Sequence, residues 1–267
     1  MKLAVSNIAW PAVCNAEAFA VLSANGITGL EVAPSVIWPD WKNITAPALH
    51  SFRRTAEEAG LQIVALQSIL FQKPGLHLFG DPTVRRALLE HLKLCADLAA
   101  GLGAKCVVFG APKNRVRGDI SDSCAFDIAA GVFSEAAQEF ASRGTCLAFE
   151  PNPEAYSCDF ATTSESAAAL VGAVNSPGFR LHLDTACLYL AGETAAQAVY
   201  KNAEILAHFH VSEPHLHSFA SPQLEHAAIA EALENYPHWV SLEMRSTTTP
   251  MDSLRQAAAF LRNTYGH

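Results

Sequence analysis

The chain has 267 residues, of which 50% are apolar and 16% are charged, so it can form a large folded core. Its formal net charge of −8 argues against a general nucleic-acid binder, because such proteins carry a basic face. No stretch approaches the roughly 20 apolar residues of a membrane span, and the first residues do not resemble a signal peptide. Seven scattered cysteines without Cys-x-x-Cys spacing indicate reduced thiols, so we predict a cytoplasmic protein without nucleic-acid or membrane partners.

Short apolar runs with strand-forming residues alternate with longer helical runs along the whole chain. The predicted strands are 2–9, 27–34, 61–68, 104–110, 145–150, 179–184, 205–211 and 239–243. The predicted helices are 15–25, 46–59, 82–102, 122–142, 163–174, 193–203, 223–235 and 250–264. Strict alternation indicates parallel strands with right-handed crossovers, and eight such units at this length favour a (β/α)8 TIM barrel that spans 1–267 as one domain. No Gly-x-Gly-x-x-Gly follows the first predicted strand, which argues against a dinucleotide-binding sheet.

Four of the predicted strands share one design in the second half of the chain. Each is a short apolar run that has a metal-competent side chain at its C-terminal end, namely Glu150, Asp184, His210 and Glu243. Alternate residues of a barrel strand point inward, and this parity separates these polar side chains from bulky apolar neighbours in all four strands. The C-terminal strand ends are also where such barrels carry their chemistry. We therefore expect the four side chains to converge.

Inward carboxylates are costly unless they are paired, and three together raise one another's pKa values. One divalent cation removes this conflict, and the mixed oxygen and nitrogen donors suit Mn²⁺, Co²⁺, Mg²⁺, Fe²⁺ or Zn²⁺. The same strand parity turns His182 and His208 inward, where they can hydrogen-bond the ligands. A single carboxylate at a strand end more often faces solvent or caps a helix, and a single histidine more often belongs to a core. Four equivalent positions favour the metal site.

Five motifs give the chain a resemblance to a known superfamily. They are GLEV at 29–32, FEPNP at 149–153, LDT at 183–185, HFHVSEP at 208–214 and SLEM at 241–244. In this order and spacing they resemble the xylose isomerase-like TIM barrels, which include sugar phosphate isomerases and the D-tagatose and D-psicose 3-epimerases. The resemblance implies one metal ion held by Glu150, Asp184, His210 and Glu243. It also implies that Glu150 and Glu243 exchange protons at a carbon next to a carbonyl.

Three positions depart from the epimerase pattern. Cys187 stands where the epimerases have histidine, Tyr156 where they have glutamate, and Leu216 where they have arginine. In that family the replaced residues bind the substrate. The resemblance therefore implies the metal chemistry but does not indicate a ketohexose substrate.

Several further side chains are candidates for substrate contact. Lys113, Arg115 and Arg117 follow the fourth predicted strand, where they are either anion ligands or ordinary solvated charges. The other candidates are Tyr156, His182, Glu213, His215 and Arg245, and a structural ion pair is an equal alternative for Arg245. Glu31, at the end of the second predicted strand, is expected to be structural.

We expect a metal-dependent isomerase or epimerase that acts on a sugar, a sugar phosphate or a small polyhydroxy acid. The alternatives are a metal-dependent lyase or dehydratase on the same scaffold, and a non-catalytic sugar-binding barrel. Glu150 and Glu243 argue against the latter, because a binder does not need two facing carboxylates. The expected partner is a small carbohydrate-like molecule, and the sequence leaves open whether the protein is a homo-oligomer.

Overall fold

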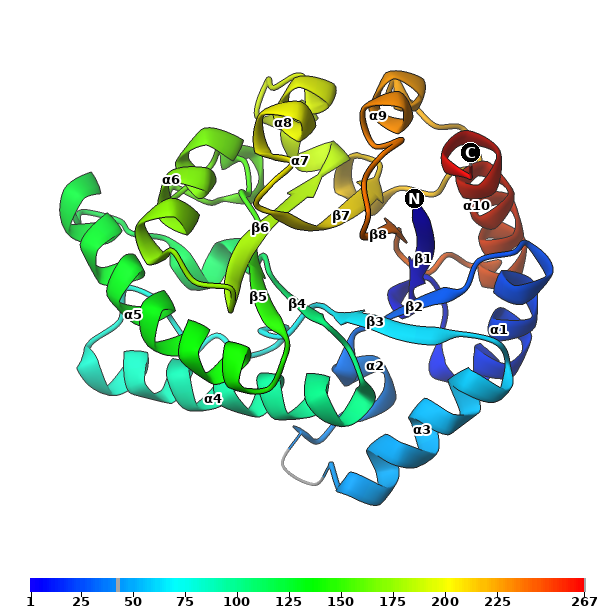
Figure 1. Ribbon diagram of the computed structural model, residues 1–267, viewed down its shortest axis with the longest axis horizontal. Helices are drawn as coiled ribbons and strands as arrows, with labels where there is room; N and C mark the ends of the chain where they lie inside the picture. Colours follow the sequence, from blue (N-terminus) through cyan, green and yellow to red (C-terminus); the bar gives the residue numbers. More distant parts are fainter. Residues whose placement is uncertain (42–43, 267) are drawn as a thin grey trace.

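The computed structural model describes residues 1–41 and 44–266, and its centre is a closed barrel of parallel strands (Figure 1). Each strand pairs with the next along the chain, and β8 pairs with β1, which closes the barrel. The strands are β1 (Lys2–Ser6), β2 (Gly29–Val32), β3 (Gln62–Leu66), β4 (Cys106–Phe109), β5 (Cys146–Phe149), β6 (Phe179–Asp184), β7 (Leu206–Ser212) and β8 (Trp239–Glu243). The predicted (β/α)8 TIM barrel is therefore confirmed.

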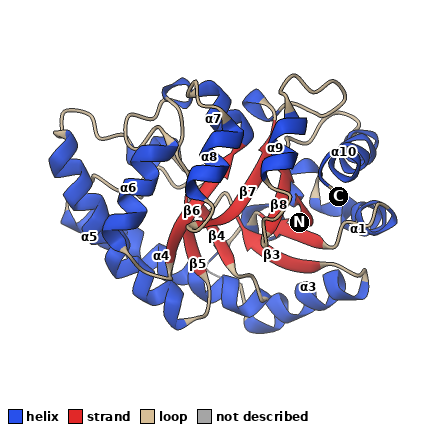
Figure 2. Cartoon of the chain, turned by 45° about the horizontal axis from the view of Figure 1, so that its top comes forward, coloured by secondary structure: helices blue, strands red, loops and turns tan. Residues whose placement is uncertain are grey.

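Helices surround the barrel on its outside (Figure 2). They are α1 (Asn15–Ala24), α2 (Pro34–Ile37), α3 (Ala46–Glu58), α4 (Pro82–Leu102), α5 (Asp122–Ser142), α6 (Ser164–Val174), α7 (Thr185–Leu190), α8 (Ala195–Asn202), α9 (His226–Ala232) and α10 (Pro250–Tyr265). The eight predicted helices all occur, most within a few residues of the expected ends. The short helices α2 and α7 were not predicted. None of the helices in residues 1–41 and 44–266 is both long and apolar enough to cross a membrane.

The inward and outward faces of the strands separate as the sequence parity predicts. Leu147 and Phe149 of β5 are fully buried on the outer side, where Phe149 packs against Phe133 of α5 with ring centroids 5.4 Å apart. Ala148 and Cys146 belong instead to a small apolar cluster with Ala4, Val64, Ala65 and Cys106. The core between strands and helices is therefore large and aromatic, whereas this second cluster is made of small side chains.

The first strand is shorter than expected. Strand β1 ends at Ser6, and Asn7–Ala9 form a turn of 3-10 helix, whereas the sequence pattern predicts a strand over 2–9. The hydroxyl of Ser6 accepts a hydrogen bond from the backbone N–H of Ile8 at 3.4 Å, which caps this turn. The buried Asn7 side chain then accepts from the backbone N–H of Ala33 at 2.7 Å and ties the ends of β1 and β2 together.

Candidate metal centre

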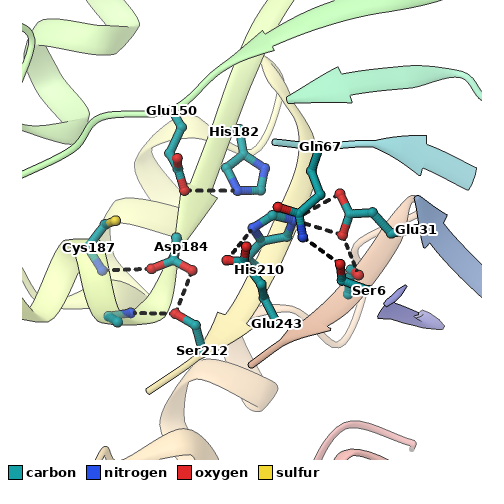
Figure 3. A network of polar contacts seen from close by, with 12 residues as sticks. Ser6, Glu31, Gln67, Glu150, His182, Asp184, Cys187, His210, Ser212 and Glu243 are labelled. Carbon is teal, nitrogen blue, oxygen red and sulfur yellow. Dashed lines mark hydrogen bonds and ion pairs between the residues drawn. The ribbon is translucent and has the colours of Figure 1, made fainter. Parts of the chain in front are cut away.

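The four side chains at the ends of β5 to β8 gather around one space at the C-terminal mouth of the barrel (Figure 3). Asp184, His210 and Glu243 each offer a ligand atom within 4.8 Å of the others. Glu150 joins two overlapping groups at the same spacing, one with Asp184 and Cys187 and one with His182 and His210. The four residues predicted as ligands therefore form one continuous cluster.

His210 lies between two carboxylates. Its Nε2 atom is 2.9 and 3.0 Å from the two carboxylate oxygens of Glu31, and its Nδ1 atom is 3.3 Å from Oε2 of Glu243. Glu31 is fully buried and also accepts a hydrogen bond from the Ser241 hydroxyl at 2.6 Å, while His208 Nε2 lies 3.2 Å from it. Glu31 thus fixes the imidazole through its Nε2 side. The Nδ1 atom is left facing the space shared with Asp184 and Glu243.

Asp184 is fixed by two hydrogen bonds. Its Oδ1 atom accepts from the backbone N–H of Cys187 at 2.7 Å and thereby caps helix α7, and its Oδ2 atom accepts from the Ser212 hydroxyl at 2.5 Å. Each carboxylate oxygen has a second lone pair, so these bonds set the orientation and leave acceptor capacity for a cation. The cap also explains why a helix begins directly after β6.

Glu150 is positioned by small and polar neighbours. Its Oε2 atom accepts from the Asn152 side-chain amide at 3.0 Å, and Oε1 lies 3.5 Å from His182 Nε2, which is too long for a good hydrogen bond. The carboxylate occupies the space beside Gly110, because a Cβ on that glycine would lie 2.3 Å from Oε2. Only glycine at the end of β4 leaves room for this rotamer of Glu150.

The buried charges of the centre strongly perturb one another in the metal-free protein. Burial and the charges of Glu150 and Glu243 raise the pKa of Asp184 to about 7, and burial also raises the pKa of Glu150. Burial opposes charge on Glu31 as well, but positive charge on His210 and His208 outweighs it and holds the Glu31 pKa well below its usual value. Burial likewise opposes charge on His210, yet Glu31 and Glu243 raise its pKa well above the ordinary value. Without a metal ion, Asp184, Glu150 and His210 therefore all bind protons more tightly than they would in water.

This donor set fits a divalent cation. Within the described residues, the buried atoms without a hydrogen bond include His210 Nδ1 and both ring nitrogens of His182. Burial and the nearby histidines lower the pKa of His182 well below its usual value, so its ring is neutral and able to donate a lone pair. Buried polar atoms without partners are costly, and a cation among carboxylates and imidazoles would satisfy them.

The basic loop after β4 differs from the sequence-based expectation. Arg115 was expected at the entrance, either as an anion ligand or as a solvated charge, but its side chain is fully buried. It donates to the backbone carbonyl of Glu150 at 2.7 Å and lies 4.5 Å from the centroid of the Phe149 ring. Arg117 contacts Asp159 and the carbonyl of Ile120. The loop folds back so that Arg115 supports the end of β5, and of the three basic side chains on this loop only Lys113 is exposed.

Glu213 also differs from its expected role in substrate contact. Its carboxylate is buried, lies 2.8 Å from His226 Nε2, and accepts hydrogen bonds from the backbone N–H groups of Gln223 and Leu224. These contacts occupy the carboxylate within the protein. It holds the loop after β7 against α9.

Tyr156, His215 and Arg245 do lie on the loops at the mouth. The Tyr156 hydroxyl accepts a hydrogen bond from the backbone N–H of His215 at 3.0 Å, and the two rings are 5.8 Å apart. Burial, together with the charges of Cys187 and Asp184, raises the pKa of Tyr156 to about 12, so the phenol is neutral near pH 7. Arg245 follows the end of β8 by two residues and is exposed.

Sequence reasoning missed several residues of the centre. Glu31 was expected to be structural, yet it contacts His210 directly. Ser212 and Asn152 hold the carboxylates of Asp184 and Glu150, and the buried Cys187 lies within 4.8 Å of both carboxylates. The GLEV motif at the end of β2 contained a usable signal, because inward parity places Glu31 at the same level as the other strand ends.

Several solved structures share this fold over nearly the whole chain. Comparison with curated proteins found no significant match. D-psicose 3-epimerase with D-fructose superposes with a TM-score of 0.81 at 16% identity, covering 100% of both chains. The 3-keto-D-glucoside 4-epimerase of E. coli gives 0.79 at 19%, covering 98% of this chain and 99% of that one. The IolI protein with a bound zinc atom gives 0.77 at 16%, covering 100% and 98%.

These identities show a shared fold. The family assignment comes from the sequence itself, because the profile of the xylose isomerase-like TIM barrel family matches residues 19–264, which is nearly the whole chain. The motifs at the ends of β2, β5, β6, β7 and β8 lie inside this range. The chain therefore belongs to the xylose isomerase-like TIM barrel family.

Proposed function

We propose that the protein is a metal-dependent isomerase or epimerase of a sugar, a sugar phosphate or a small polyhydroxy acid. The observation that carries the proposal is the cluster of Glu150, Asp184, His210 and Glu243, whose ligand atoms lie in overlapping groups within 4.8 Å. Family membership and the epimerase folds of two structural neighbours support the same class of chemistry. The zinc atom in a third neighbour supports metal binding by a barrel of this fold.

The four residues would hold one divalent ion, which is Mn²⁺, Co²⁺, Mg²⁺, Fe²⁺ or Zn²⁺ by donor chemistry. When bound, such an ion supplies positive charge that makes a C–H next to a carbonyl more acidic. Glu31 holds the Nε2 side of His210, so that Nδ1 is presented to the ion. Ser212 and the N–H of Cys187 hold Asp184 in its ligating orientation.

Glu150 and Glu243 would act as the proton-transfer pair. They come from β5 and β8, which are separated by β6 and β7, so they enter the central space from different sides. Burial raises the pKa of Glu150, which makes this carboxylate a stronger base than an exposed glutamate. One carboxylate removes the proton from the substrate carbon and the other delivers a proton to it. Which carboxylate acts first depends on the substrate.

The test combines metal analysis with solvent exchange. Protein loaded in turn with each of the five metals is incubated in D₂O with a panel of sugars, sugar phosphates and sugar acids, and substrate deuteration is followed by NMR. We expect metal-dependent exchange that a chelator abolishes. Glu150→Gln and Glu243→Gln should each lower it about 10²- to 10⁴-fold, the range for loss of a general acid or base.

The matched control is Glu165→Gln, which changes an exposed glutamate on α6 and should leave exchange unchanged. Circular dichroism and thermal unfolding establish that the variants are folded. A folded protein that binds none of the five metals, or exchange unaffected by both catalytic substitutions, would overturn the proposal.

A further inference from the structure

A cavity of about 430 Å³ opens beside the candidate metal centre, between the loops that follow β7 and β8. Its lining comes from two segments, 215–223 and 245–247. The first segment begins five residues after His210 and the second two residues after Glu243. An extended chain advances at most about 3.6 Å per residue, so the Cα of Arg245 lies within about 7 Å of that of Glu243. The cavity and the metal centre thus share one end of the barrel.

The lining of this cavity is basic in a protein that is acidic overall. It contains the exposed guanidinium of Arg245 and the imidazoles of His215 and His217, whose rings lie 6.1 Å apart, and it includes no carboxylate. In residues 1–41 and 44–266 the Arg245 guanidinium has no hydrogen-bond or ion-pair partner. The net charge of the chain is −8, so a basic cavity is not explained by average composition. An unpaired guanidinium is the side chain best suited to bind phosphate or carboxylate with two hydrogen bonds.

The backbone of the cavity is held in a costly conformation. His215 and Leu216 both have left-handed backbone angles, with φ of 61° and 58°, which side chains other than glycine rarely adopt. Such conformations are unfavourable and persist where the surroundings fix them. Here the Tyr156 hydroxyl accepts from the N–H of His215, and the carbonyl of Leu216 accepts from the N–H of Arg245 at 3.0 Å. The two segments of the cavity are therefore joined directly.

Glu213 holds the other end of the 215–223 segment. Its carboxylate accepts from the N–H groups of Gln223 and Leu224, which fixes the far end of the 215–223 segment. The same carboxylate lies 2.8 Å from His226 Nε2. Glu213 thus holds one end of this segment, and among the described residues it forms no ion pair with Arg245.

We propose that this cavity binds the anionic end of the substrate, a phosphate or carboxylate group, through Arg245, His215 and His217. This inference rests on the proposed function in one respect, since it names the class of substrate that reaches the metal centre. A substrate anchored here by its charged end would direct its uncharged carbons toward Glu243 and Glu150. The substrates are then sugar phosphates or sugar acids, and neutral sugars lack the anchor.

The first experiment tests the cavity without requiring catalysis. Inorganic phosphate is titrated into metal-loaded and metal-free protein, and the histidine ring resonances are followed by NMR. Phosphate should shift the signals of His215 and His217, and Arg245→Gln should weaken its binding about tenfold to hundredfold. Phosphate that binds only a central metal ion would bind the variant as tightly as the wild type, which would overturn the inference.

Arg262→Gln is the matched control. Arg262 is also exposed and without a partner within the described residues, but it lies on the last turn of α10, where neighbouring residues border Met1 at the other end of the barrel. This control should bind phosphate as the wild type does. His217→Gln is a second variant that keeps the test decisive if Arg245→Gln does not fold, and it should weaken phosphate binding severalfold.

The second experiment compares matched substrates in the D₂O exchange assay. D-fructose, D-fructose 6-phosphate and D-fructuronate present a neutral, a phosphate and a carboxylate end, so the two charged arms distinguish the sources of the anion. At least one charged compound should exchange faster than D-fructose, and Arg245→Gln should lower that exchange about tenfold or more, a much larger loss than it causes with D-fructose. Equal loss for neutral and charged substrates would overturn the inference. No exchange with any compound, together with Arg245-dependent phosphate binding, would count against the proposed function and leave the anion site standing.

Discussion

Two of the buried glutamate–histidine pairs among the described residues, His210–Glu31 and His226–Glu213, differ in what surrounds the histidine. In the central pair, His210 Nε2 contacts Glu31 at 2.9 Å, while its Nδ1 atom makes no hydrogen bond. In the peripheral pair, His226 Nε2 lies 2.8 Å from Glu213 and its Nδ1 atom lies 2.7 Å from the hydroxyl of Tyr265. Both rings are buried, but only the peripheral ring uses both nitrogens.

The free nitrogen distinguishes a ligand-binding histidine from a structural one. The peripheral pair joins residues that are 13 positions apart and ties α9 and the end of α10 to the loop after β7, so it works as a closed structural link. The central pair joins strands 179 positions apart and leaves a nitrogen facing two carboxylates. A buried polar atom without a partner is destabilising, and such atoms persist where they serve a ligand. Substitutions in the central pair should therefore change metal affinity strongly, and substitutions in the peripheral pair should not.

Glu31→Gln should weaken metal binding about 10- to 100-fold, the usual cost of losing a carboxylate that orients a ligating histidine. The substitution keeps the size of the side chain and the contact to His210 Nε2, but it removes the negative charge that makes the imidazole a stronger donor. The measurement is competition with a chelating dye on folded protein.

Its control is Ser241→Ala, which removes the 2.6 Å hydrogen bond to Glu31 without changing any charge, and it should lower the affinity only severalfold. Unchanged affinity in Glu31→Gln would show that the central pair is as purely structural as the peripheral one.

Metal affinity should rise with pH between about 6 and 8. Burial and the charges of Glu150 and Glu243 raise the pKa of Asp184 to about 7, so below that pH an ion must displace its proton. Burial opposes charge on His210, but Glu31 and Glu243 raise its pKa well above the ordinary value, so an ion that binds Nδ1 of the charged ring displaces a second proton. Each displaced proton changes the apparent affinity up to tenfold per pH unit. Calorimetry in buffers of different ionisation enthalpy should therefore show between one and two protons released per ion. Release of no proton would contradict the charge arrangement.

The sequence predicted the strand ends well because their signal is local. Alternation within β6, β7 and β8 alone turns Asp184, His210 and Glu243 inward, and the eightfold β–α pattern brings their ends to one face. A pattern of period two cannot identify contacts between distant strands, and the partnership of Glu31 with His210 is therefore visible only in the closed barrel.

The loops are where the sequence pattern predicted side-chain positions least well. Arg115 and Glu213 look like exposed charges beside strand ends, but each is buried by the way its loop folds back onto the barrel. Helix α7 has only six residues, too few for a readable helical period, and its cap is the Asp184 that the pattern indicates as a ligand. The same residue type can thus serve two roles, and only the positions of its neighbours decide between them.

Glu213→Gln should leave metal affinity within about twofold of the wild type and lower the free energy of unfolding by about 1–3 kcal/mol, since a buried charged acceptor loses its charge. The backbone N–H groups of Gln223 and Leu224 and the ring of His226 would retain only a neutral acceptor. Denaturant unfolding of the metal-free protein measures the loss, and Tyr265→Phe, which removes the hydroxyl on the other side of His226, should cost about 1 kcal/mol in the same assay. A fall in metal affinity comparable with that of Glu31→Gln would mean that the peripheral pair also supports the metal centre, through the loop after β7.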